Sequence, residues 1–268
     1  MKKLPLWKEA SSFGEAEKNW DEGAKAARKI CPLKIPKSLP SMVGITPETQ
    51  KGLKWKSLKW MIKEDKNRAI LKNILQHPFK YPLSFLKSVF KKSSYIRDDD
   101  FFLYGIKNVD EFKILLKKPN VLLVAGFSYC HKPHECPSGR FTTSCIHDSE
   151  NPVCRQCYIG KCVNALPENN VKPLFITTIH YIGEEIFKLV HANPNKQVIF
   201  IITACEMTLQ MFGDFGNMVG IKGIGVRLDG RICNTMKAFE LSEQGIKPGL
   251  TVVLDHTQKR ILDLLRLL

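Results

Sequence analysis

The sequence predicts an α/β fold, a Rossmann-like arrangement of three layers around a parallel sheet. Five short apolar runs alternate with amphipathic stretches from residue 121 onward. Such runs are typical of strands buried on both faces, and their alternation with helices gives a parallel sheet covered on either side. The charge also changes along the chain, since residues 1–120 hold 26 Lys and Arg against 13 Asp and Glu. We therefore expect a basic N-terminal region over residues 1–118 and an α/β domain over residues 119–268.

The basic region is expected to be mostly helical. Its amphipathic stretches are 11–30, 65–76 and 108–118, and a proline-rich segment occupies 31–40. Residues 51–66, KGLKWKSLKWMIKEDK, interleave lysines with two tryptophans. Two interpretations stay open for this segment: a helix docked on the main domain, or a peripheral contact with an anionic membrane surface. A nucleic-acid partner is not expected, because no recognised binding signature accompanies the charge.

The expected strands and helices of the α/β domain follow one another in strict alternation. The strands are predicted at 121–127, 173–178, 197–203, 221–228 and 250–255. Helices are predicted at 180–192, 206–215, 235–244 and 256–268. Right-handed crossovers should join these units, so the loops that follow the strands gather at one edge of the sheet.

The nine cysteines favour metal or redox chemistry over a disulfide framework. The chain is long enough to bury its own core, and its count of cysteines is odd. The N-terminus lacks the uninterrupted apolar run of a signal peptide, and no stretch is long and apolar enough to cross a bilayer. We expect a cytoplasmic chain, at the inner membrane face if the basic region contacts lipid. Clustered thiols in a reducing compartment more often bind metal than form disulfides.

Several cysteines are expected at the carboxyl edge of the sheet, where ligands of open α/β sheets bind. Cys130 follows the first strand, Cys205 ends the third, and Cys233 lies just beyond the fourth. With Cys136 they form one predicted cofactor-binding set of four thiols. His180 and His256 follow other strands, and we expect them to be polar groups at helix starts rather than ligands.

Residues 130–165 form a predicted cysteine-rich insertion after the first strand. Cys154 and Cys157 make a C-x2-C unit, Cys162 follows after Gly160, and Cys145 precedes them. Thiolates at this spacing suit zinc, which takes four in a tetrahedron, and equally an iron–sulfur cluster. This insertion makes the second part of the chain a predicted metal-binding domain.

The count of thiols favours iron–sulfur over zinc, because the eight cysteines from residue 130 onward divide into two sets of four. We expect one or two [4Fe-4S] clusters, with Zn as the alternative. The spacing also allows other divisions of the eight cysteines into two sets, in particular one in which Cys136 and Cys145 exchange places. Cys31 is left over as an ordinary thiol.

The order of these features resembles a cysteine-rich α/β family of bacteria and archaea that is catalogued as a domain of unknown function, number 116 in its series. The matching segments are CPSGRF, CRQCYIGKC, TACEMTL and GIGVRLDGRICNT, within about residues 120–255. The resemblance implies an iron–sulfur or other metal-binding protein. The cysteines that match are Cys136, Cys154, Cys157, Cys162, Cys205 and Cys233. Family members often carry N-terminal membrane spans, and this chain has a basic region there instead.

Three hypotheses of function follow. The first is an iron–sulfur protein of electron transfer or of cluster-dependent chemistry on a small molecule, in which Glu206, Asn234 and Thr235 are candidate catalytic groups. As an enzyme it would be an iron–sulfur-dependent oxidoreductase or lyase, and its basic region would attract an acidic redox partner. The second is a zinc-stabilised Rossmann-like binding module without redox activity. The third is a thiol enzyme with Cys205 or Cys233 as nucleophile and a histidine as base.

Overall fold

The computed structural model describes residues 5–8, 10–34, 44–65, 95–220 and 222–268, with scattered residues between 67 and 86. For residues 214–219 it describes the backbone alone. The helix predicted at 65–76 and the proline-rich segment at 31–40 therefore lie largely outside the described residues.

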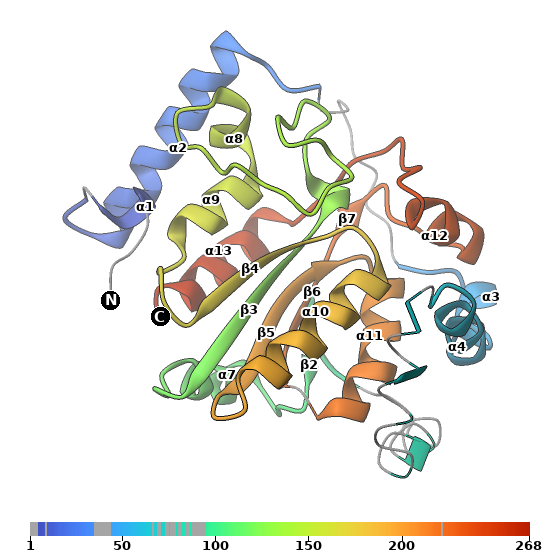
Figure 1. Ribbon diagram of the computed structural model, residues 1–268. Coiled ribbons are helices and arrows are strands. Elements are labelled where there is room, and N and C mark those ends of the chain that lie inside the picture. The colour runs from blue at the N-terminus through green and yellow to red at the C-terminus, as the bar shows by residue number, and fades with distance from the viewer. Residues whose placement is uncertain are drawn as a thin grey trace.

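The main sheet has six strands in the order β1-β2-β6-β5-β3-β4 (Figure 1). Four of them, β3, β4, β5 and β6, are parallel, while β2 and β1 extend the sheet in antiparallel fashion. The bounds are β1 Ile96–Asp98, β2 Phe101–Tyr104, β3 Val121–Ser128, β4 Val171–Ile176, β5 Gln197–Ala204 and β6 Lys222–Arg227. The prediction of an α/β fold with a mostly parallel sheet is thus confirmed, and the strand order is compatible with a Rossmann-like fold.

Two features of the sheet differ from the expectation. Residues 96–104 belong to the region that was expected to be helical, yet they form β1 and β2 and pair against β6. The run at 250–255 contributes only β8, Thr251–Val252, which pairs with β7, Asp229–Gly230, in a separate small sheet. Because β2 already occupies the free edge of β6, no place remains beside β6 for a further parallel strand.

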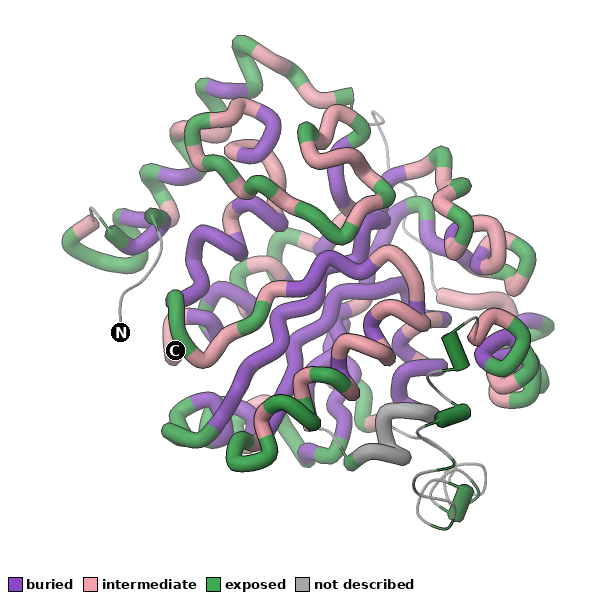
Figure 2. The backbone as a smooth tube through the Cα atoms, in the orientation of Figure 1, coloured by how far each residue is buried: buried purple, intermediate pink, exposed green. Residues whose placement is uncertain are grey.

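Helices cover both faces of the sheet, which gives the three layers. One face packs against α10, Ile179–Ala192, and α11, Glu206–Val219. The other packs against α7, Val109–Leu116, α9, Tyr158–Ala165, and α13, Asp255–Leu265. Side chains alternate along β3, since Leu123 and Phe127 point to the second layer and Leu122 and Val124 to the first. The strands between these layers are buried nearly throughout (Figure 2).

The N-terminal helices pack on the same core rather than forming a separate unit. Helices α1, Pro5–Lys8, and α2, Phe13–Ile30, lie against α9 and α8, Pro152–Gln156 (Figure 1). Trp7 and Trp20 are buried in the same cluster as the sheet residues.

Helix α4, Leu53–Lys63, follows the short α3, Pro47–Gln50, and docks against α11. It buries Trp60 and Met61 and leaves Trp55 60% exposed. This agrees with a docked helix, and a membrane contact stays a prediction. No helix in the described part of the chain is long and apolar enough to cross a membrane.

Candidate functional site

The connection between β3 and β4 carries six of the nine cysteines. It begins with a single 3-10 turn, Tyr129–His131, and later forms α8 and α9. Asn151 starts α8, because its side-chain oxygen accepts hydrogen bonds from the N–H groups of Val153 and Cys154 at 3.0 and 3.2 Å. Pro152 occupies the first turn of α8, where no hydrogen-bond donor is needed. The local sequence thus places Cys154 and Cys157 on one short helix and its end.

Four of these cysteines line one pocket around a lysine. Cys136, Cys145, Cys154 and Cys157 share the pocket with the side chain of Lys132. Gly160 allows α8 and α9 to approach closely, because a Cβ at this position would meet the Cys154 carbonyl oxygen at 2.3 Å. The connection therefore folds back on itself and brings four thiols to one place.

Lys132 is 1% exposed, which is unusual for a lysine. Its Nζ donates to the carbonyl oxygens of Gly139, Thr142 and Ser144 at 3.4, 2.9 and 2.7 Å. No carboxylate among the described residues makes an ion pair with it. Burial lowers the pKa of the Lys132 ammonium, while the nearby thiols of Cys136, Cys145 and Cys157 act in the opposite direction. The Lys132 side chain therefore lies buried beside the thiols, and no described residue supplies an anionic partner.

Three thiols of this group, those of Cys145, Cys154 and Cys157, hold their protons more firmly than an ordinary cysteine. Burial raises the pKa of Cys154 to about 11 and that of Cys157 to about 12, and it also raises the pKa of Cys145. Metal binding to these residues would displace protons, since thiolates are the ligands.

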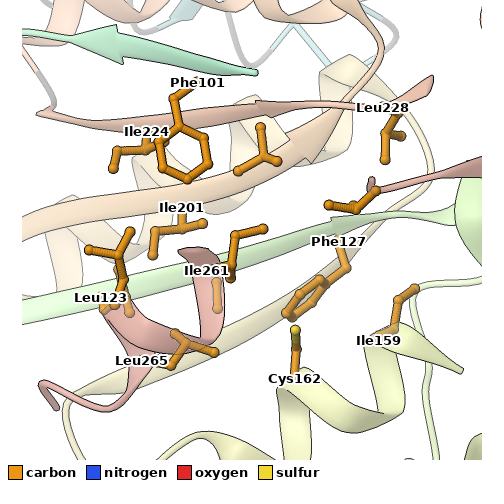
Figure 3. Packing of buried hydrophobic residues seen from close by; sticks show 14 of the residues in the cluster. Phe101, Leu123, Phe127, Ile159, Cys162, Ile201, Ile224, Leu228, Ile261 and Leu265 are labelled. Carbon is orange, nitrogen blue, oxygen red and sulfur yellow. The ribbon is translucent and has the colours of Figure 1, made fainter. Parts of the chain in front are cut away.

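Cys162 lies apart from the other cysteines of the connection. It is fully buried on α9, and its sulfur points at the ring of Phe127 in the core (Figure 3). Burial raises the pKa of Cys162 to about 12. The pocket around Lys132 therefore contains Cys136 and not Cys162, whose role as a metal ligand stays a prediction.

A second group of thiols lies at the carboxyl edge of the sheet, where β3, β5 and the loop after β7 end (Figure 1). Cys205 and Cys233 interact electrostatically with each other, and Cys130 interacts with both. Lys247 donates from Nζ to Cys233 Sγ over 3.3 Å. The structure thus brings together Cys130, Cys205 and Cys233, three of the four members of the expected cofactor-binding set.

The pKa values of Cys205 and Cys233 move in opposite directions. The interaction with Cys205 lowers the pKa of Cys233, and the Lys247 ammonium acts in the same direction. The pKa of Cys205 is raised by its interaction with Cys233 and by burial. Negative charge is therefore favoured on Cys233 over Cys205.

The three candidate catalytic groups lie at the same edge but already have structural partners. Glu206 begins α11, is buried, and lies 3.4 Å from Arg97 Nη1. The carbonyl oxygen of Asn234 accepts a hydrogen bond from the N–H of Thr46 at 3.4 Å. Thr235 caps helix α12, Met236–Ser242, through its hydroxyl oxygen. These contacts give each of the three residues a structural role, because they connect the elements that surround the thiols.

The two histidines that were expected at helix starts, His180 and His256, are bonded elsewhere than to the thiols. His180 Nε2 lies 3.0 Å from the Met61 carbonyl oxygen, and His256 Nε2 lies 3.1 Å from Asp99 Oδ2. Cations next to the two thiol groups include Lys132 and Lys247, which the sequence did not single out. Lys132 could have been noticed, because it lies between Cys130 and Cys136 in CHKPHEC. Lys247 is distant in sequence from every cysteine, and only the fold reveals it.

One group of metal-binding donors in the described residues lies within 4.8 Å, and it consists of Asp99, Asp100 and His256. Asp100 is already paired with Arg227 at 3.0 Å, and Asp99 is 3.5 Å from Arg260. No three cysteine sulfurs of the described residues lie that close together. All nine cysteines are free of disulfides.

Comparisons with protein-family models, with curated proteins and with solved structures find no match to this chain. The resemblance to the family of unknown function therefore stays a prediction that rests on the placing of the cysteines.

Proposed function

We propose that this chain is an iron–sulfur protein of electron transfer, with one cluster held by Cys136, Cys145, Cys154 and Cys157. The observation that carries this proposal is the buried ammonium of Lys132 beside these four thiols, without a carboxylate partner in the described residues. An unpaired buried charge is costly, so it indicates that an anion occupies the neighbouring space in the working protein. A cluster with thiolate ligands is such an anion.

The spacing of the sulfurs favours a cluster over a single zinc ion. A tetrahedral zinc with Zn–S bonds of about 2.3 Å holds its sulfurs about 3.8 Å apart. No three cysteine sulfurs of the described residues lie within 4.8 Å of one another. In a [4Fe-4S] cluster each thiolate binds a different iron, so the sulfurs are farther apart. The four thiols around Lys132 line one pocket without the close spacing of a zinc site.

The donor set also favours electron transfer over catalysis at iron. Four thiolates supply one ligand to every iron of a [4Fe-4S] cluster, which leaves no open iron for a substrate. When bound, the cluster supplies reversible one-electron chemistry. Lys132 would stabilise the extra negative charge of the reduced state, and the carbonyl oxygens around Lys132 hold that ammonium in place. The basic balance of residues 1–120 would attract an acidic redox partner.

The test is to purify the chain without oxygen and to measure iron, acid-labile sulfide and zinc per chain with the visible spectrum. About four irons with matching sulfide are expected. The variant Cys145→Ala should lose most of the iron, because one of four ligands is removed. Cys31→Ala is the matched control. This variant should keep its full iron content, since Cys31 lies outside the pocket.

Two results would contradict the proposal. Zinc at about one ion per chain without sulfide would favour a zinc-stabilised binding module instead. Equal loss of iron in Cys130→Ala and in Cys145→Ala would mean that the cluster uses the sheet-edge thiols.

A further inference from the structure

A cavity of about 390 Å³ lies between the end of α2 and the cysteine-rich connection. Its walls come from the segment after α2, from the connection around Glu135 and Gln156, and from the chain between β8 and α13. Pro133 and Cys157 line both this cavity and the pocket around Lys132, while the other lining residues differ. The volume falls within the range of small-molecule sites in proteins.

Three side chains that line the cavity each hold a buried oxygen without a hydrogen-bond partner in the described residues. These oxygens are Glu135 Oε2, Gln156 Oε1 and Thr251 Oγ1. The whole Thr251 side chain is buried, at 2% exposure. Buried polar atoms nearly always have a partner, so three exceptions on the walls of one cavity indicate that a bound molecule supplies the partners.

The partners that Gln156 and Glu135 lack are hydrogen-bond donors. The Gln156 Nε2 donates to the carbonyl oxygens of Cys31 and Pro152 at 2.9 and 2.8 Å. Only the NH₂ group of an amide can do this, so Gln156 Oε1 is left as an acceptor. Glu135 Oε1 accepts from the Lys34 backbone N–H at 3.1 Å, and Glu135 Oε2 is a further acceptor when the carboxylate is ionised. An ammonium group is the donor that a carboxylate binds most strongly.

The charges at the mouth of the cavity differ from those in its depth. Arg28, Lys34 and Asp255 are exposed and therefore lie at the mouth, where two cations outweigh one carboxylate. Glu135 is half-buried and Thr251 is buried, so the acceptors lie deeper. A ligand fits this distribution when its cationic end points inward and its anionic end points outward.

Apolar side chains line the cavity between these two polar ends. Leu33, Leu250 and Val253 contribute aliphatic groups, and Tyr158 contributes a ring. Leu250 and Val253 are buried. The ligand should therefore carry an apolar group beside its two charges, because this group loses contact with water in the cavity.

We propose that this cavity binds a free α-amino acid with a large apolar side chain. Its ammonium group lies inward and donates to the unpartnered oxygens, and its carboxylate lies outward near Arg28 and Lys34. A molecule with one sign of charge satisfies only one end of the cavity. This inference goes beyond electron transfer and does not depend on a cluster in the pocket around Lys132.

The first experiment measures binding to the full-length chain, purified without oxygen, by isothermal titration calorimetry. L-Phenylalanine and L-leucine carry both charges and an apolar side chain. Phenethylamine lacks the carboxylate of phenylalanine, and 3-phenylpropanoate lacks its ammonium. At least one of the two amino acids should bind, and each truncated compound should bind about tenfold more weakly than L-phenylalanine or worse, because a hydrogen bond between charged groups is lost. Absence of binding by both amino acids, or equal binding of L-phenylalanine and either truncated compound, would overturn the proposal.

The second experiment assigns the two ends of the ligand with two variants. Glu135→Gln should weaken the binding of L-phenylalanine about tenfold and should not weaken that of 3-phenylpropanoate, which has no ammonium. Arg28→Met changes an exposed side chain and should weaken the binding of L-phenylalanine but not that of phenethylamine. Glu150→Gln is the matched control, since Glu150 is an exposed acid of the same connection outside the cavity. Wild-type binding of L-phenylalanine in both Glu135→Gln and Arg28→Met would place the amino acid elsewhere and refute the assignment.

Discussion

The side chain of His131 should make the stability of this chain depend on pH. Its Nε2 lies 2.9 Å from the hydroxyl of Thr203, and burial lowers its pKa to about 3, with Lys132 and Arg140 acting in the same direction. In the unfolded chain a histidine has a pKa near about 6.5. Between these values the unfolded state binds more protons, so stability must fall as the pH falls through this window.

We expect the free energy of unfolding to drop by up to about 1.4 kcal/mol per pH unit between about pH 6 and pH 3.5 through this histidine. The variant His131→Gln can keep a hydrogen bond to Thr203 but does not titrate, so its curve should be flatter there. Urea unfolding at several pH values measures the difference. Parallel curves for the two proteins would show that His131 is protonated in the folded state as readily as in the unfolded one.

Lys132 offers a test of the cluster proposal that does not remove a ligand. The variant Lys132→Met keeps an unbranched side chain that is one atom shorter and removes its charge. We expect the reduction potential of the cluster to become more negative, because a nearby cation stabilises the reduced state. Lys188→Met on the surface of α10 is the control, since Lys188 pairs with Glu185 far from the connection. Equal potentials in both variants would argue against an anionic centre beside Lys132.

At the scale of elements, the contact between α8 and α9 determines where the four thiols meet. A Cβ on Gly160 would come within 2.3 Å of the Cys154 carbonyl oxygen, which belongs to the backbone and cannot rotate away. We expect Gly160→Ala to push α8 away from α9, to lower the iron content and to destabilise the fold by about 1–3 kcal/mol.

Gly183→Ala is the matched control for this helix substitution. Gly183 lies in α10, and a Cβ added there would meet no neighbouring atom within 4 Å beyond the backbone of its own helix. An alanine in a helix interior is favoured over glycine by about 1 kcal/mol, so this variant should be as stable as the wild type or more so. Iron and thermal unfolding are measured for both. Full iron content in Gly160→Ala would mean that the close approach does not position the thiols.

Sequence periodicity predicted the elements of the parallel sheet well and its edges poorly. The strands at 121–127 and 197–203 appear nearly as expected, because continuous apolar runs report burial on both faces. The strand at 101–104, FFLY, has only four residues and follows three aspartates, so its pattern does not separate it from the helix that follows it. Its pairing with β6 depends on residues far away in the sequence.

The candidate site, like the sheet, was predicted from the sequence only in part. The rule that strand ends gather at one edge brought Cys130, Cys205 and Cys233 to one predicted location, and the structure places them together. The exchange of Cys136 with Cys145, and the place of Cys162, could not be decided from spacing. They depend on how the connection folds around Lys132 and on which face of α9 enters the core.

At the scale of the whole molecule, the described residues before 119 share a hydrophobic core with those after it. Phe101 and Phe102 of β2 are completely buried, one on each face of the sheet. Asp100, next to β2, is buried and bonded both to Arg227 on β6 and to Thr257 on α13 at 3.0 and 2.7 Å. Removal of this segment would expose one edge of β6 and take away the nearer of the two buried carboxylates that pair with Arg227.

We therefore expect a fragment of residues 119–268 not to unfold cooperatively, whereas a fragment of residues 95–268 should retain the sheet with reduced stability. The longer fragment keeps β1 and β2 but loses α1 and α2, whose Trp7 and Trp20 are buried in the shared core. Truncation of one buried large aromatic side chain lowers the free energy of unfolding by about 3–5 kcal/mol, so the loss of two is a severe destabilisation. The order of the strands in the sheet should nevertheless stay the same. Circular dichroism with urea unfolding distinguishes the fragments. A cooperative transition for 119–268 that matches the full chain would mean that the basic region and the α/β part fold independently, and the pairing of β2 with β6 would then be dispensable.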